Sequence, residues 1–369
     1  MEINPFQAVY PNLAYITSAD FFFATVKEAY SDYRKSDFFQ KSAEDAIYIY
    51  QIKTNENTYT GLIGCATVQD YINNKIKKHE NTLASKEQQQ LQLMIKRGAA
   101  VKPILVTYRT VGAIEKLIAQ QIKKIKPFYT ISFEDSLEEH TIWKIQEGKT
   151  IQKIQDIFAK KVPHVYIADG HHRTSTSALM AKKMKEKKKK GQYDQILTAF
   201  FAVKELSIYD YNRVVEGLDD RTMARFMAEI SQLFDIKILK KAAKPRKKFE
   251  LTMLIGEEWF RLKWKKEILE KYKTENVLLD ASLLEEEVMK NIMKIKDTKT
   301  DNRITYVEGP KGFEQIAKRT RKDENKIAFC LYPVVIEDLF KVADAGAIMP
   351  PKSTWFEPRV KNGLLVLEF

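Results

Sequence analysis

The stretch His164-Val-Tyr-Ile-Ala-Asp-Gly-His-His-Arg-Thr174 joins a short apolar run to a cluster of polar side chains. Residues 164–168 predict a buried strand, and residues 175–188 predict a helix that follows it. When a strand turns through glycine into a helix, the first N–H groups of the helix lack intrahelical partners and lie at the positive end of the helix dipole. The stretch therefore predicts an α/β protein with a site for an anion such as phosphate.

The residue types in this turn suit an anion site. Gly170 lets the backbone turn tightly and approach a ligand, and the guanidinium of Arg173 can hold a phosphate with two N–H groups. Asp169 would repel phosphate unless it binds Mg²⁺ or orients a histidine. The candidate phosphate-binding residues are Asp169, Gly170, His171, His172, Arg173 and Thr174. A capped turn with surface histidines is the alternative interpretation.

A second polar cluster lies upstream, in the loop Lys77-Lys-His-Glu-Asn-Thr82. Its lysines, Lys77 and Lys78, can contact phosphate, and either His79 or Glu80 can act as a general base. Taken alone, the loop is typical of a solvated surface segment. Its functional interpretation depends on its coming together with the first cluster.

A third cluster, Met349-Pro-Pro-Lys-Ser-Thr-Trp-Phe-Glu-Pro358, contains three prolines that favour a rigid extended path. Trp355 and Phe356 can stack on a base or close a lid. A tail pinned to the core by two aromatic side chains explains the same pattern equally well.

The length and composition of the chain indicate the number of domains and the cellular environment. A chain of 369 residues with 44% hydrophobic residues is long enough for two domains, which we expect over residues 1–210 and 211–369. Two cysteines, Cys65 and Cys330, fit a reducing compartment and rule out a disulfide framework. The N-terminus does not resemble a signal peptide, and no apolar run is long enough to span a membrane, so we expect a cytoplasmic protein.

The net charge is +13, and the run Lys182-Lys-Met-Lys-Glu-Lys-Lys-Lys-Lys190 carries much of the excess. Lysines without arginines or interleaved aromatic residues are typical of an exposed helix end rather than of a surface that reads bases. We therefore expect no specific binding of nucleic acid. A zinc site is not expected either, because the two cysteines lack the usual spacing.

Apolar runs and helical periodicity alternate along the chain, which predicts a mixed α/β fold. In the first part we expect strands at 46–52, 59–68, 103–108, 130–133, 140–145, 164–168 and 196–203, and helices at 85–97, 111–125, 150–160 and 175–188. After residue 210, helices at 222–233 and 279–289 and strands near Ile304 and at 327–331 predict a second α/β layer.

Four segments resemble the bacterial and archaeal family of domain-of-unknown-function 1015. They are Ile76-Lys-Lys-His-Glu80, Tyr166-Ile-Ala-Asp-Gly-His-His-Arg173, Asp210-Tyr-Asn-Arg-Val-Val215 and Met349-Pro-Pro-Lys-Ser-Thr-Trp-Phe-Glu-Pro358. The Asp-Gly-His-His-Arg box is also similar to the phosphate-binding box of the ParB/sulfiredoxin superfamily, and most of all to that of the free serine kinases. His171 stands where the sulfiredoxin box has its cysteine, so a reductase role is not expected.

The resemblance implies a ParB/sulfiredoxin-like N-terminal domain with a mixed sheet, and a nucleotide, ATP or ADP, held with Mg²⁺ by residues 169–174. CTP, the nucleotide of the partition proteins, remains open as a third donor. It also implies that Glu80 is the catalytic base. His79 is its rival, since neutral imidazole can also accept a proton near pH 7, and Asp169 is a further catalytic candidate. Arg213, Lys352 and Trp355, from the two later segments, become candidates for a substrate or lid site. The implied activity is phosphorylation of a small hydroxylated metabolite, with free L-serine the leading candidate. A non-catalytic nucleotide-binding regulator and a nucleotide hydrolase remain the alternatives.

Overall fold

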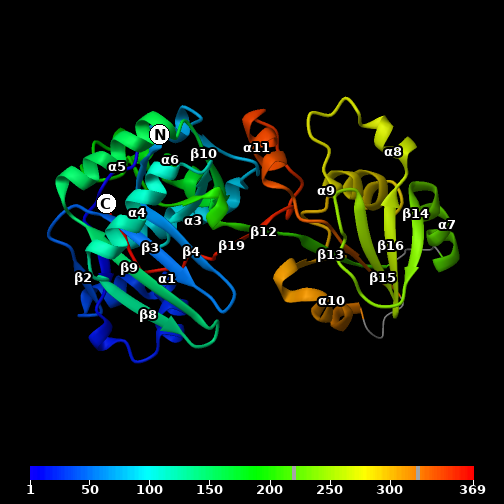
Figure 1. The fold of residues 1–369 in the computed structure, drawn as a ribbon, viewed down its shortest axis with the longest axis horizontal. Helices are drawn as coiled ribbons and strands as arrows, with labels where there is room; N and C mark the ends of the chain where they lie inside the picture. The colour runs from blue at the N-terminus through cyan, green and yellow to red at the C-terminus, as the bar shows by residue number, and fades with distance from the viewer. Residues whose placement is uncertain (218–221, 321–324) are drawn as a thin grey trace. The chain divides into compact units, whose positions relative to one another are not determined.

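In the computed structural model, which describes residues 1–217, 222–320 and 325–369, the chain divides into two compact units (Figure 1). The first comprises Met1–Ser207 and Pro358–Phe369, and the second comprises Ile208–Glu357. The chain enters the second unit three residues before the boundary predicted at 210. The sequence prediction also assigned residues 358–369 to the C-terminal domain, whereas the structure places them in the first unit.

An eight-stranded mixed sheet in the order β5-β10-β7-β11-β4-β3-β9-β8 forms the first unit. Only the pairs β5–β10 and β7–β11 are parallel. The strands are β3 (Ile47–Lys53), β4 (Thr58–Thr67), β5 (Ile76–Lys77), β7 (Ile104–Tyr108), β8 (Tyr129–Phe133), β9 (Glu138–Ile145), β10 (Val165–Asp169) and β11 (Gln195–Ala202). The helices are α1 (Ala19–Lys35), α2 (Val68–Ile72), α3 (Ala84–Arg97), α4 (Gly112–Lys124), α5 (Gly148–Lys161) and α6 (His171–Glu186). The mixed α/β class predicted from the sequence is confirmed, while assignment to the ParB/sulfiredoxin group stays a prediction.

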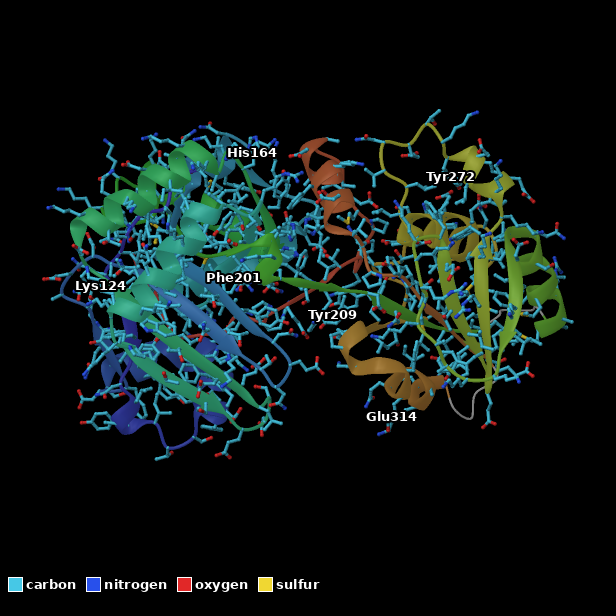
Figure 2. All side chains as sticks on the ribbon, in the orientation of Figure 1. Lys124, His164, Phe201, Tyr209, Tyr272 and Glu314 are labelled. Atoms are coloured by element: carbon cyan, nitrogen blue, oxygen red, sulfur yellow. The ribbon has the colours of Figure 1, made fainter. Side chains whose placement is uncertain are left out.

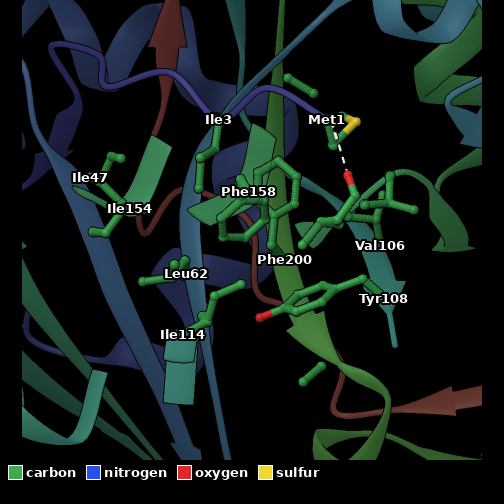
Figure 3. Packing of buried hydrophobic residues seen from close by; sticks show 14 of the residues in the cluster. Met1, Ile3, Ile47, Leu62, Val106, Tyr108, Ile114, Ile154, Phe158 and Phe200 are labelled. Atoms are coloured by element: carbon green, nitrogen blue, oxygen red, sulfur yellow. Dashed lines mark hydrogen bonds between the residues drawn. The ribbon is translucent and has the colours of Figure 1, made fainter. Parts of the chain in front are cut away.

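One face of this sheet packs on α4 and α5 and forms the main core of the unit. Alternate residues of the central strands, such as Val106 and Phe200, point to this face and meet Phe158 of α5 (Figure 3). The rings of Phe158 and Phe200 lie edge to face with their centroids 5.4 Å apart. Figure 2 shows Phe201, which points to the opposite face of β11, and Lys124, which lies at the exposed end of α4.

The segment 358–369 is held to the first unit at several points. Val366 forms a bridge with Val9, and β20 (Leu367–Glu368) pairs with β6 (Ala99–Ala100). The carboxylate of Glu368 lies 2.7 Å from Arg34 Nε and 3.6 Å from Lys41 Nζ. These backbone and ionic contacts explain why the segment does not stay with the second unit, which the sequence pattern alone did not show.

The second unit has an antiparallel six-stranded sheet in the order β14-β16-β15-β18-β13-β17. Its strands are β13 (Tyr211–Glu216), β14 (Phe234–Leu239), β15 (Glu250–Ile255), β16 (Glu258–Trp264), β17 (Ile304–Glu308) and β18 (Lys326–Cys330). The helices are α7 (Met223–Leu233), α8 (Lys266–Lys271), α9 (Asp280–Leu283), which continues as a π-helical segment Leu284–Lys290, α10 (Gly312–Thr320) and α11 (Ile336–Asp344). Two short strands, β12 (Ser207–Tyr209) and β19 (Trp355–Glu357), pair where the chain enters and leaves the unit.

The remaining short elements are β1 (Val9–Pro11) and β2 (Phe39–Lys41), which pair with each other, and three 3-10 turns, Leu13–Tyr15, Val203–Glu205 and Gly309–Lys311. Among the described residues, no helix combines the length and the apolar character that a membrane crossing requires.

Replacing Phe200 by alanine tests the core of the first unit. Its side chain is fully buried, so Phe200→Ala should lower the free energy of unfolding by about 3–5 kcal/mol through lost burial and a residual cavity. Phe21, which is 67% exposed, provides a matched control, and Phe21→Ala should change stability by less than about 0.5 kcal/mol. Urea unfolding, with hydrogen exchange of β4 and β11 peptides to follow this unit separately, measures both. Equal effects of the two variants would contradict the packing described.

Candidate functional site

The parallel pairing of β5 with β10 brings two of the predicted clusters together. Ile76 pairs with Val165 and Lys77 with Tyr166, so the segments that follow both strands leave the sheet at the same edge. The backbone N–H of His79 lies 3.4 Å from His171 Nε2, and Glu80 Oε2 lies 3.6 Å from His171 Nδ1. Residues separated by about ninety positions in the sequence therefore share one site.

The helix α6 begins at His171, directly after the turn at Gly170, and not near Ser175 as the sequence predicted. Gly170 occupies the N-cap position with φ of 109°, no side chain caps the helix, and its first turn contains no acidic residue. The first helical hydrogen bond runs from Thr174 N to Gly170 O. The backbone N–H groups before Thr174 therefore have no partner within the helix and point out of its N-terminal end.

Two hydroxyl groups at the start of α6 form hydrogen bonds within the helix. Thr174 Oγ1 donates to Gly170 O, and Ser177 Oγ donates to Arg173 O. Both hydroxyls are therefore directed back to helix carbonyls, and neither caps the N-terminus. The open N-terminus remains suited to an exogenous anion.

The side chain of Arg173, in the first turn of α6, binds the end of strand β10. Its Nη2 donates to Asp169 Oδ2 at 2.9 Å, and its Nη1 donates to the carbonyl of Pro103 at 3.1 Å. A Cβ atom added to Gly170 would lie 2.9 Å from Arg173 Nη2 and 3.0 Å from Ile104 Cγ2. Glycine is thus required here both for its backbone conformation and for the close approach of the guanidinium.

Two further cations, which the sequence analysis missed, meet the same carboxylate. Asp169 Oδ2 lies 3.6 Å from Lys102 Nζ and 3.8 Å from Arg359 Nη2. Lys102 precedes β7, which runs antiparallel to β10, and Arg359 belongs to the segment 358–369. Neither residue lies in a recognisable motif. The only sequence signal for Arg359 is that it directly follows the proline-rich segment.

The charges of this cluster shift the pKa values of its members. Burial would raise the pKa of Asp169, but the attraction of Arg173, Arg359 and Lys102 outweighs it and lowers that pKa well below the usual value. Burial and the repulsion of Arg173 lower the pKa of Lys102 to about 8. Three cations surround one carboxylate, so the cluster has a surplus of positive charge.

His79 and His171 form a buried pair with their ring centroids 4.5 Å apart and their planes at 80°. Burial lowers the pKa of His79 to about 4, and burial together with His79 lowers the pKa of His171 well below its usual value. Both imidazoles are therefore neutral near pH 7. Glu80 is different, since its side chain is 37% exposed whereas His79 is only 1% exposed.

His172 lies in the first turn of α6, and of the two predicted lysines Lys78 is near this helix end. Burial and the nearby Lys86 lower the pKa of His172, and its Nδ1 atom is buried without a hydrogen-bond partner among the described residues. Lys77 is buried on β5, whereas Lys78 is exposed. The side chain of Lys78 is close enough to lower the pKa of His171.

The three residues predicted for a substrate or lid site lie in the second unit. Arg213 Nη2 donates to the carbonyl of Lys352 at 3.3 Å, and Lys352 Nζ lies 5.1 Å from the centre of the Tyr211 ring. The rings of Tyr211 and Trp355 meet edge to face at 5.8 Å. Arg213, Lys352 and Trp355 thus gather around Tyr211, and their part in a substrate site stays a prediction.

The described residues contain no group of three histidine, cysteine or acidic side chains that could hold a metal ion. Asp169 is a poor candidate for a Mg²⁺ ligand, because its Oδ2 already faces three cations. Mg²⁺ often binds through substrate phosphates with one or two carboxylates. Any Mg²⁺ at this site would therefore be held mainly by the phosphates of a nucleotide.

The profile of a family described as protein of unknown function (DUF1015) matches residues 10–321, and no curated protein sequence matches the chain. Among solved structures, SbnI with a C-terminal truncation from Staphylococcus aureus has a TM-score of 0.43 and 11% identity, covering 80% of this chain and 82% of that one. A free serine kinase in complex with AMP has a TM-score of 0.39 and 12% identity, covering 80% and 87%. A conserved hypothetical protein from Pyrococcus furiosus has a TM-score of 0.37 and 12% identity, covering 81% and 94%. Likeness at these TM-scores assigns no activity or ligand to this chain.

Replacing Gly170 by alanine tests the geometry of the turn. Gly98, whose φ is 63° and beside which an added Cβ would meet nothing within 4 Å, is the control for the backbone cost alone. Gly98→Ala should cost about 1–2 kcal/mol. Gly170→Ala should cost about 1–3 kcal/mol more, because the added methyl group must displace Arg173. Equal losses in urea unfolding would show that Arg173 does not pack on Gly170.

The buried histidine pair predicts acid sensitivity. The pKa of His79 is about 4 in the folded chain and near 6.5 in the unfolded chain, so the unfolded state binds more protons between these values. Stability should therefore fall as the pH drops from 6.5 to 4, by about 3 kcal/mol from His79. His79→Gln should flatten this slope in unfolding curves measured across that range. His164→Gln, which replaces an exposed histidine, should retain most of it. A slope unchanged by His79→Gln would contradict the assignment.

Proposed function

Because the chain belongs to the DUF1015 family, whose description gives no activity, we propose a function from the site itself: a nucleotide-dependent kinase that phosphorylates a small hydroxylated metabolite. Free L-serine is the first acceptor to test, since the Asp169–Arg173 box resembles that of the free serine kinases. ATP or ADP is the expected phosphate donor.

The observation that carries this proposal is the uncapped N-terminus of α6 with an accessible carboxylate beside it. The outward N–H groups of the first helical turn, together with the cations around Asp169, favour the phosphates of a nucleotide. Glu80 lies next to the first residue of that helix, at 3.6 Å from His171 Nδ1. Phosphate-binding groups and a proton acceptor at one sheet edge suit phosphoryl transfer, whose catalysis consists largely of positioning and charge neutralisation.

In the proposed reaction, the hydroxyl oxygen of the acceptor attacks the terminal phosphorus of the nucleotide. The bond from that phosphorus to the bridging oxygen breaks, and the shortened nucleotide leaves with the electron pair. Glu80 accepts the hydroxyl proton. Lys77, Lys78 and the first turn of α6 offset the negative charge of the phosphates. Mg²⁺, when bound to the nucleotide, adds further charge neutralisation.

The structure favours Glu80 over His79 as the proton acceptor. His79 is only 1% exposed, so an acceptor hydroxyl has little access to its ring nitrogens. The carboxylate of Glu80 is 37% exposed and can face an acceptor. His171, which contacts both residues, acts as a positioning residue for Glu80.

The variant Glu80→Gln tests the proposed base. It removes the proton acceptor and keeps the side-chain size, so transfer from ATP to L-serine should fall by about 10²–10⁴-fold while the Kd for ATP changes little. Glu186→Gln, at the exposed far end of α6, is the matched control and should transfer phosphate normally. Product formation is measured over a panel of hydroxylated amino acids and metabolites, with Mg²⁺ present.

The outcomes separate the three functional classes. Normal turnover by Glu80→Gln, with loss of turnover in His79→Asn, would assign the base to His79. Nucleotide binding by the wild-type chain without product from any acceptor would favour a regulator. Release of inorganic phosphate that does not depend on an acceptor would favour a hydrolase.

A further inference from the structure

Lys102 and Arg359 are the cations of this site that no motif explains. We propose that both residues bind the terminal phosphates of a nucleoside di- or triphosphate, together with Arg173 and the start of α6. The inference deepens the function proposed above and rests on it for the identity of the nucleotide. The proposed site binds a phosphoanhydride chain, and two residues from outside the Asp169–Thr174 segment complete it.

The geometry places all three cations on one oxygen atom. Asp169 Oδ2 lies 2.9 Å from Arg173, 3.6 Å from Lys102 and 3.8 Å from Arg359. A guanidinium carries about five N–H donors and an ammonium about three. The contacts to Asp169 and Pro103 use only part of the donors of Arg173 and Lys102, so these two residues can bind a second anion without releasing Asp169.

The charge of the cluster indicates the class of anion. One carboxylate cannot neutralise three cations. Burial lowers the pKa of Lys102 to about 8, and the repulsion of Arg173 and Arg359 adds to this effect. An anion with several negative charges relieves this repulsion, and the adjacent helix N-terminus attracts it further. A phosphoanhydride chain meets this requirement better than the single phosphate of AMP.

Both residues are accessible enough to reach such a ligand. The side chain of Lys102 is 25% exposed, and that of Arg359 is 40% exposed. Lys102 is fixed by the start of β7, and Arg359 is fixed by the segment 358–369, which is itself bound through β20 and Glu368. The site thus receives cations from three separate parts of the first unit.

The experiment compares ATP, inorganic pyrophosphate and AMP as probes, by calorimetry on the full chain. Arg359→Gln and Lys102→Gln should each weaken binding of ATP and pyrophosphate by about 10- to 100-fold, the range for a hydrogen bond to a charged group. The affinity for AMP should change by less than about threefold. Lys361→Gln is the matched control, because Lys361 lies on the same segment as Arg359 but pairs with Glu138 at 2.7 Å.

Proton uptake provides a second measurement for Lys102. A bound phosphate raises the pKa of a nearby ammonium, so ATP binding at pH 8 should take up protons. The uptake appears as a difference in binding enthalpy between buffers of unequal ionisation enthalpy. It should be lost in Lys102→Gln and retained in Lys361→Gln.

The results distinguish this inference from the kinase proposal. If ATP and pyrophosphate bind and depend on Lys102 and Arg359, the inference holds even when no acceptor is phosphorylated. If phosphate is transferred but Arg359→Gln and Lys102→Gln bind ATP as the wild type does, the kinase proposal survives and the inference is overturned. Equal weakening by Arg359→Gln and Lys361→Gln would also overturn it, because both variants would then act through the stability of the segment.

Discussion

A carboxylate at the end of a buried strand needs a positive partner, and the organisation of the site depends on this constraint. Asp169 ends β10 with its side chain only 25% exposed. Arg173 supplies the closest cation because α6 starts at once and brings residue 173 back over Gly170. The strand, the glycine turn and the helix are therefore one electrostatic unit. Leaving the carboxylate without partners in this environment would carry a cost of several kcal/mol, by the usual estimates for buried charges.

Helices and strands of the first unit could be predicted because periodicity and turn residues are contained in short stretches of sequence. Periodicity located β10, β11, α4 and the mixed α/β class, and the glycine turn located the helix N-terminus to within four residues. The approach of Glu80 to His171 was anticipated only through a family resemblance, because strand pairing between β5 and β10 is a long-range event without a residue pattern of its own. The sequence analysis missed Lys102 and Arg359, because neither lies in a recognisable motif. Their neighbours in space, not in sequence, give them their importance.

His79 and Glu80 show how burial changes the interpretation of a motif. The local sequence did not rank His79 and Glu80 as candidates for a base, and only the family resemblance favoured Glu80. In the structure, His79 packs against His171 away from solvent, and its neutral form is held by desolvation. Glu80, at the margin of this pair, keeps 37% of its side chain exposed. Two adjacent residues of one loop thus differ in chemistry because one side chain is buried and the other is partly exposed.

The position of residues 358–369 has a consequence for biosynthesis. A ribosome must complete the whole of Ile208–Glu357 before this segment emerges, although the segment belongs to the first unit. While the second unit is being synthesised, the nascent first unit therefore lacks β20, the Glu368 contacts and Arg359. The third cation beside Asp169 arrives only after that point. An interrupted translation product would present the sheet but not the completed cluster, so the fold couples assembly of the site to synthesis through residue 369.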